Sequence, residues 1–393
     1  MSSKRKKKFQ DSEDDECSLS DLDQLWESSL DDWVEIVPDE YSNSTLIIEK
    51  DNWEIEDFKR EKVDLKCMKD ECMYRKNFYE KEDSFNLSVR TDDDEYFVFN
   101  VLDNENKSEI LMAKHSVESS EMKTIPRKQI KVGLMKKIFC QTYTDDKLIQ
   151  LYDPELKGSE ISYCSKSEDE KDLLTLTEYF NRDKYKIGIV YVKEGQLSEK
   201  QYLWNKGHSQ RFEDFLSILG SKEDLLGFGG FSGGLDIKYG SCGEKSLYTQ
   251  WNNSEIMFHV STLIPFDPLD KQQIIRKRHI GNNSVMVVFL DGNVKFDPDS
   301  FVTKFIHVII VVRVIQVWGK IKYRVEVTKR KCVPDFLPLL PTPPIFEKDQ
   351  LREFLLTKIC QAERTALGSG TFLKRYHFLR ADIIKKIYKR NLY

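Results

Sequence analysis

Two apolar runs, Glu255-Ile256-Met257-Phe258-His259-Val260-Ser261-Thr262 and Ser284-Val285-Met286-Val287-Val288-Phe289, enclose the cationic stretch Arg276-Lys277-Arg278-His279-Ile280-Gly281-Asn282. Both runs are rich in β-branched and aromatic residues, which suit buried strands. The stretch between them carries positive charge and one carboxamide at a turn. We therefore expect this stretch to lie at the edge of a sheet that carries the functional residues.

A short amphipathic helix is predicted over 270–279. The segment contains good helix formers, and Asp270 stands where an acid favours the N-terminus. Cations occupy its last turn, and Gly281 follows as a stop signal. This helix would present Asn282 at its end.

Several further motifs occur in the same order as in a known family. Together with residues 255–282, these motifs resemble the Rap-type GTPase-activating proteins, the wider family that includes tuberin. The resemblance covers roughly 74–393 and is strongest after residue 185. The motifs are Tyr74-Arg75-Lys76-Asn77-Phe78, Gly188-Ile189-Val190-Tyr191, Phe215-Leu216, Gly233-Gly234-Leu235-Asp236, Ser246-Leu247-Tyr248 and Glu353-Phe354-Leu355-Leu356-Thr357-Lys358.

The resemblance implies an activity and a role for one amide. Many GTPases position the attacking water with a glutamine carboxamide, and a GTPase without it needs help. Rap is of this kind, and the resemblance implies that Asn282 is supplied in trans as an asparagine thumb. A neutral amide both donates and accepts hydrogen bonds, so it orients water without changing protonation state. His279, one turn earlier on the same face, is expected to support the helix end or the switch region of the GTPase.

An arginine finger from Arg276 or Arg278, both expected to be exposed, is the competing mechanism. In the thumb mechanism the cations Arg276, Lys277, Arg278 and Lys193 instead contact an acidic GTPase surface. Two residues depart from the family pattern: Asn283 stands where an Asp usually follows the thumb, and Ser232 stands where an Arg is expected.

The expected fold combines two classes, α+β and α/β, in three parts. Residues 1–45 form an acidic tail expected to be disordered, because it is rich in acids and poor in apolar residues. Residues 46–182 form a strand-rich domain that resembles the family's dimerisation domain; an accessory domain without a partner is the alternative. Residues 183–393 form the α/β catalytic domain with a central mixed sheet.

Individual elements follow from hydrophobic periodicity. The C-terminal basic helix is expected to present a solvated cationic surface. The predicted strands are 85–89, 96–101, 109–113, 185–192, 257–260, 285–290, 306–315 and 323–328, with a strand or helix at 131–140, and the predicted helices are 210–219, 349–366 and 372–390.

Composition excludes several other classes of protein. Lys plus Arg total 61 and Asp plus Glu total 66, so the net charge is −5. The chain therefore lacks the excess of basic residues that is typical of nucleic-acid-binding proteins. The eight cysteines lack zinc-site spacing, so no metal and no cofactor are expected, and free thiols indicate an intracellular protein. Gly227–Gly234 lacks the Lys and Ser or Thr that complete a P-loop. No signal peptide or apolar span of ~20 residues is present, so we expect a cytoplasmic protein with at most peripheral membrane contact.

The predicted function is therefore activation of a Ras-like small GTPase, Rap first, by a homodimer that is not itself an enzyme. GTP and Mg would be bound by the partner GTPase. Two alternatives stay open: a scaffold that binds a GTPase without accelerating hydrolysis, and an activator of Rheb or Ral that uses an arginine finger.

Overall fold

The computed structural model describes residues 44–48, 52–56, 73–103, 109–126, 145–164, 166–179 and 182–391. Nearly all of the acidic tail lies outside these residues, including the basic run Lys4–Lys8 near its start, and so does the element expected at 131–140.

The larger unit is built on a mixed sheet, as the sequence predicts. Its path is β1-β13-β12-β11-β7-β10-β9-β8, with β14 paired to β13. Strands β10, β7, β11 and β12 are parallel neighbours, and antiparallel strands flank them on both sides. The strands are β1 Trp53–Ile55, β7 Lys184–Lys193, β8 Ser221–Asp224, β9 Lys245–Trp251, β10 Ser254–Val260, β11 Val285–Asp291, β12 Val308–Val317, β13 Lys320–Arg330 and β14 Ile345–Phe346.

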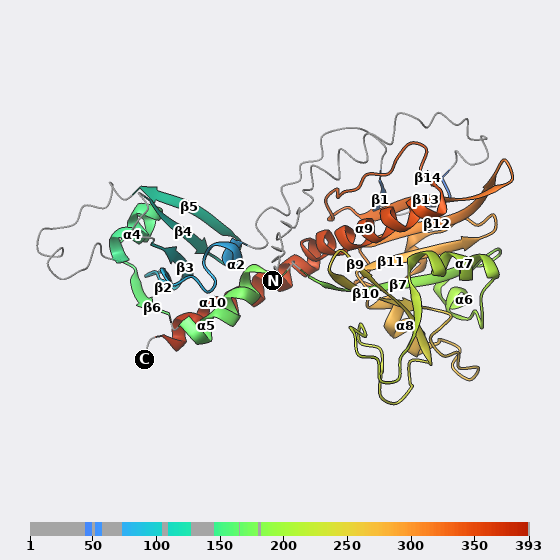
Figure 1. Cartoon of the computed structure of the whole chain (residues 1–393), viewed down its shortest axis with the longest axis horizontal. Helices are drawn as coiled ribbons and strands as arrows, with labels where there is room; N and C mark the ends of the chain where they lie inside the picture. Colours follow the sequence, from blue (N-terminus) through green and yellow to red (C-terminus); the bar gives the residue numbers. More distant parts are fainter. Residues whose placement is uncertain are drawn as a thin grey trace, which may run out of the picture.

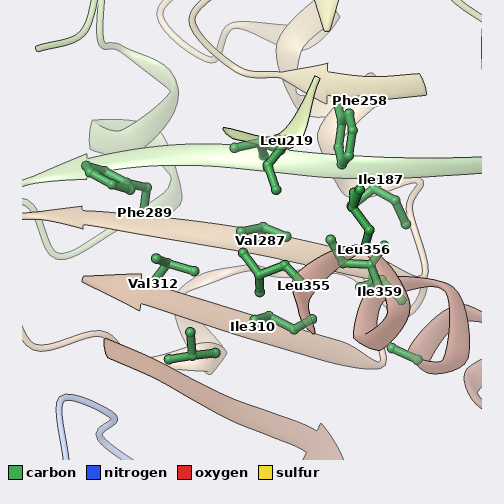
Figure 2. Close-up of a cluster of buried hydrophobic side chains, with 14 of the residues drawn as sticks. Ile187, Leu219, Phe258, Val287, Phe289, Ile310, Val312, Leu355, Leu356 and Ile359 are labelled. Carbon is green, nitrogen blue, oxygen red and sulfur yellow. The ribbon is translucent and has the colours of Figure 1, made fainter. Parts of the chain in front are cut away.

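One face of this sheet is covered by two helices, α7 (Gln210–Leu219) and α9 (Lys348–Leu367). Alternate strand residues such as Ile187, Phe258 and Val287 pack against Leu355 and other side chains of α9 (Figure 2). Because side chains alternate across a strand, the remaining strand residues must be buried on the opposite face.

The opposite face carries α6 (Glu199–Leu203) and α8 (Ile274–Gly281). Val190 and Val192 of β7 and Met286 and Val288 of β11 pack there against Ile280 of α8. This second apolar layer places α8 against the central parallel strands. The sheet is thus buried on both faces, which explains the continuous apolar runs in its central strands.

The smaller unit is a five-stranded antiparallel sheet in the order β5-β4-β3-β2-β6. One face packs on α4 (Asp145–Tyr152), which contributes Leu148 and Ile149, and the other packs on α2, α5 and α10. The remaining elements are β2 Ser84–Arg90, β3 Tyr96–Leu102, β4 Glu109–His115, β5 Ser120–Pro126, β6 Glu160–Tyr163, α2 Met73–Asn77, α5 Lys166–Thr177 and α10 Gly370–Arg390, with 3-10 turns at Pro154–Leu156 and Pro298–Ser300.

Two segments belong to a different unit from the one that the expected boundaries at residues 46 and 183 assign them to. Strand β1 pairs with β13 of the larger sheet. Helix α10 leaves the end of α9 and reaches the smaller sheet (Figure 1), where Ile383, Ile384 and Ile387 complete its core. Both units are therefore assembled from separate parts of the chain, because hydrophobic faces find partners regardless of sequence position.

The basic helix α10 exposes Lys374, Arg375, Lys386 and Lys389, as expected of a solvated surface, but two of its arginines serve a different purpose. Arg380 is buried, and its guanidinium donates to the carbonyl oxygens of Leu176 and Ser116 at 3.0 and 2.9 Å. Arg390 pairs with Asp172 of α5 at 2.6 Å. These cations serve to fix α10 against its neighbours.

Candidate functional site

Helix α8 begins four residues later than predicted and contains Gly281. Gln273 precedes it in the left-handed conformation, with φ of 50°. The predicted role of Asp270 at the N-terminus is confirmed, since its carboxylate accepts from the backbone N–H of Ile274 at 2.6 Å. The residues before Ile274 thus cap the helix and do not form part of it.

The two sides of α8 have different environments. Arg276, His279 and Ile280 are the buried residues of the helix, and Asn283 just beyond the helix is buried too. Ile274, Ile275, Lys277, Arg278 and Asn282 are exposed. Spacings of three, four and seven residues put Ile275, Arg278 and Asn282 on one stripe. The stripe is about 10 Å long at 1.5 Å per residue.

Several residues hold the C-terminal turn of α8 from the sheet side. Asn283 Nδ2 donates to the carbonyl oxygens of His279 at 2.7 Å and Ile280 at 3.0 Å. His259 Nδ1 lies 3.1 Å from the same His279 oxygen, and the Thr303 hydroxyl donates to the Gly281 carbonyl at 2.9 Å. The carbonyls that a helix end leaves unpaired are therefore satisfied.

Asn282 is the C-cap of α8 and its side chain is exposed. Its backbone N–H donates to the Ile280 carbonyl, and its neighbour Asn283 is fully buried. The expected exposure of Asn282 is confirmed. The chain thus holds the backbone of this carboxamide in place while its amide faces outward.

His279 is nearly buried, with 9% exposure, and is not a free surface imidazole. Its Nε2 lies 3.3 Å from the Cys242 thiol, and its ring meets that of His259 edge to face. Burial lowers the pKa of His279, and the nearby cations Arg278 and Lys186 lower it further. A neutral ring in this position packs inside the fold against Cys242 and His259, and its supporting role stays a prediction.

The prediction that Arg276 is exposed is wrong. Its side chain is 1% exposed, and its guanidinium donates to the carbonyl oxygens of Leu203, Asn205 and Ile264 at 2.8, 2.6 and 2.9 Å. Burial lowers the pKa of Arg276 to about 10. Arg276 fastens α8 to two loops, so it is available neither as an arginine finger nor as a contact for a partner.

The two neighbouring cations are exposed but differ in their surroundings. Lys277 Nζ lies 2.7 Å from the carboxylate of Glu199 in α6, which ties α6 to α8. Arg278 shares the exposed stripe with Asn282. Of the predicted contact residues, Arg278 is therefore the one placed nearest to the carboxamide along the stripe.

Lys193 is exposed but is not brought to Asn282. It ends β7 and pairs in register with Asp291 at the end of β11, whereas Asn282 precedes the start of β11. The two residues thus lie at opposite ends of the parallel strands, about 20 Å apart along the strand direction.

The glycine-rich loop at 227–234 packs beside this site. Glu255 accepts hydrogen bonds from the Phe231 backbone N–H at 2.7 Å and from the Tyr248 hydroxyl at 2.8 Å. A Cβ at Gly233, where φ is +64°, would lie 3.0 Å from His259 Nε2. Close packing on β10 thus accounts for the glycine, as expected for a permissive turn and not a phosphate loop.

Exposed apolar residues near the start of α8 were not singled out from the sequence. Leu269 is 91% exposed and Ile274 is 61% exposed, while Ile275 lies on the stripe with Asn282. Large apolar side chains gathered on a surface commonly mark an interaction site. In the sequence, the corresponding signal is three apolar residues within the otherwise polar and charged segment 269–278.

The described residues contain no cluster of His, Cys, Asp and Glu with the geometry to hold a metal ion. Within the same part of the chain, no helix has the length and apolar character needed to cross a membrane.

Residues 202–381, which include α8 and the glycine-rich loop, match the Rap/ran-GAP family model. The chain contains a Rap/Ran-GAP domain. The chain is 33% identical over 285 residues to a PH and Rap-GAP domain-containing protein of Dictyostelium discoideum, with 72% of this chain and 24% of that protein covered.

Two human proteins are also similar to the Rap/Ran-GAP domain. GTPase-activating Rap/Ran-GAP domain-like protein 3 is 39% identical, with 53% of this chain and 21% of that protein covered. Signal-induced proliferation-associated 1-like protein 3 is 42% identical, with shares of 55% and 12%. A solved structure of the TSC2 GAP domain is 30% identical, with 47% of this chain and 97% of that one covered and a TM-score of 0.43. The chain spans a quarter or less of the length of these curated relatives.

Proposed function

We propose that this protein stimulates GTP hydrolysis by a Rap-like small GTPase and supplies Asn282 in trans to position the attacking water. The observation that carries the proposal is the contrast at the end of α8: Asn282 is exposed at the C-cap while His279 and Asn283 on either side are buried. An amide on a held backbone reaches a partner's active site with little loss of conformational freedom.

The exposed stripe supports the docking of a protein partner at this site. Ile275 and Arg278 share the stripe with Asn282, so an apolar contact and a cation accompany the amide. The cation suits an acidic GTPase surface or the phosphates of bound nucleotide. GTP and Mg belong to the partner in this mechanism, and the chain itself contributes no cofactor.

Of the two arginines considered as fingers, only Arg278 retains an exposed guanidinium, since Arg276 is committed to backbone carbonyls. We assign Arg278 to docking, because the amide is the group that a GTPase without its own glutamine lacks. Activation of Rheb or Ral through an arginine finger, with Arg278 as the exposed arginine of α8, is the alternative.

Single-turnover GTP hydrolysis by Rap, Ras, Rheb and Ral, each with and without the protein, tests the proposal. We expect strong stimulation of Rap and little of Ras, because a glutamine in the GTPase competes for the same space beside the water. Asn282→Ala serves as the control. Binding to Rap without faster hydrolysis would identify a scaffold, and equal, Asn282-independent stimulation of Ras and Rap would exclude the thumb.

A further inference from the structure

Cys242 lies at the contact between the loop that follows the glycine-rich segment and the C-terminal turn of α8. The thiol is 3% exposed and packs with Leu225, Leu235 and Met257. Its sulfur lies 3.3 Å from Nε2 of His279. This contact joins residues 37 positions apart in the chain.

The loop that carries Cys242 is folded tightly on itself. The Asp236 carboxylate accepts from the backbone N–H groups of Lys238 and Ser241, both at 2.9 Å, and from the Ser241 hydroxyl at 2.7 Å. These donors hold the pKa of Asp236 well below its usual range. The Asp236 backbone N–H in turn donates to the Cys242 sulfur at 3.2 Å. The thiol is thereby fixed in position before it meets His279.

His279 is held at two points by different parts of the molecule. Cys242 contacts its ring from the loop side, while Asn283 and His259 bind its carbonyl oxygen from the sheet side. Asn282 follows three residues later, with the anchored Asn283 immediately after it. Movement of the His279 ring would therefore be passed to the turn from which the Asn282 amide projects.

We propose that Cys242 is a positioning residue: its thiol sets the His279 ring and, through it, the orientation of Asn282. The inference rests on the proposed function, in which Asn282 meets the attacking water. A misplacement of about 1 Å in such a group costs up to ~10²-fold in rate. Loss of the Cys242 contact alone, with the contacts at the His279 carbonyl kept, should lower the rate less, by about tenfold.

The test compares Cys242→Ala, Cys242→Ser and Cys332→Ala, the last removing an exposed thiol elsewhere. Single-turnover Rap-GTP hydrolysis is measured over a range of protein concentrations. We expect Cys242→Ala to lower the saturating rate about tenfold while the half-saturating concentration stays within twofold. Cys242→Ser should recover most of the rate, because a hydroxyl still pairs with imidazole, and Cys332→Ala should match the wild type.

Two further measurements distinguish positioning from folding. Thermal denaturation reports whether Cys242→Ala remains folded, and ring signals of labelled histidines report the His279 environment, with His377 in α10 as reference. Shifted His279 signals with His377 unchanged support the proposal. A saturating rate of Cys242→Ala within twofold of the wild type would overturn the proposal. Equal losses of rate in Cys242→Ala and Cys242→Ser, in proportion to their loss of thermal stability, would also overturn it.

The proposed function and this inference fail in different ways. If the wild-type protein stimulates no GTPase, the proposed function falls, and the ring signals alone decide whether Cys242 sets His279. If stimulation is present but indifferent to Cys242, the function stands and the positioning role is wrong.

Discussion

Asn283 Nδ2 donates to the carbonyl oxygen of His279 at 2.7 Å and so closes the last turn of α8 from within. The residue between this anchor and the helix, Asn282, is exposed. Two identical side chains adjacent in the chain therefore have opposite surroundings: one is buried and fixes the backbone, and the other is exposed to solvent.

Substitution of these two asparagines should separate catalysis from folding. Asn282→Ala is expected to lower stimulated hydrolysis ~10²-fold or more and leave GTPase binding within a few-fold, because only a positioning group is lost. Its melting temperature should match that of the wild type. Asn283→Ala should instead lower the free energy of unfolding by ~1–3 kcal/mol, because the carbonyls of His279 and Ile280 each lose one of their donors. Single-turnover kinetics and thermal denaturation check both results.

The two arginines of α8 should also differ. Arg276→Ala is expected to destabilise the fold by ~3 kcal/mol or more, because the carbonyls of Leu203, Asn205 and Ile264 lose a buried donor. Arg278→Ala should keep wild-type stability and mainly raise the concentration needed for half-maximal stimulation. Loss of all activity in Arg278→Ala, with Asn282→Ala still active, would replace the thumb by an arginine finger.

A buried ion pair between Glu56 and Lys358 ties the segment after β1 to α9, with the two charges 2.7 Å apart. Glu56→Ala leaves the Lys358 ammonium buried without its counter-ion, and we expect a loss of ~3–5 kcal/mol in unfolding free energy. The double variant Glu56→Ala with Lys358→Met should recover much of this loss, because no uncompensated charge remains. Urea denaturation measures both variants.

The same pair affects how the larger unit can be isolated. A fragment that begins at residue 183 lacks Glu56 and β1, although it contains α8 entirely. We expect such a fragment to be less stable than one in which 44–56 is supplied, and equal stability of the two would show that β1 is dispensable.

Acid should destabilise the protein through its buried histidines. Burial lowers the pKa of His259 to about 4, whereas an unfolded histidine titrates near 6.5. As pH falls from about 6.5 to 4, the unfolded chain binds a proton that the folded state does not, so the free energy of unfolding decreases. His259 alone should contribute on the order of 2 kcal/mol between pH 7 and 5. Urea denaturation at several pH values should show a shallower slope for His259→Gln.

The smaller unit is the part that we propose to mediate self-association. Light scattering of the whole chain should give a mass near twice 46.3 kDa. Its outer strands, β5 and β6, are edges at which a second copy of the chain could pair. They carry the exposed side chains Met122 and Tyr163. Met122→Lys should weaken a dimer formed through β5 without changing single-turnover stimulation. A monomeric wild-type chain would contradict the dimer and leave the role of Asn282 untouched.

The local pattern of apolar and polar residues in the sequence was enough to predict the central strands and the long helices. The buried run 185–192 became β7, and the periodic segment 210–219 became α7 with the predicted bounds. It also placed Asn282 at an exposed helix end. These features follow from hydrophobic period and from the residues that start and stop helices, which act over a few positions.

Only the tertiary structure decided how the cations are used and where the chain divides. Nothing local distinguishes Arg276 from Arg278, yet the first is buried against backbone carbonyls and the second is exposed to solvent. Which residues of a helix are buried depends on the side of the helix that packs against the rest of the fold. The pairing of β1 with β13, the docking of α10 on the smaller sheet and the contact of Cys242 with His279 join residues far apart in the chain. Such contacts depend on complementary surfaces that exist only once the sheets have formed.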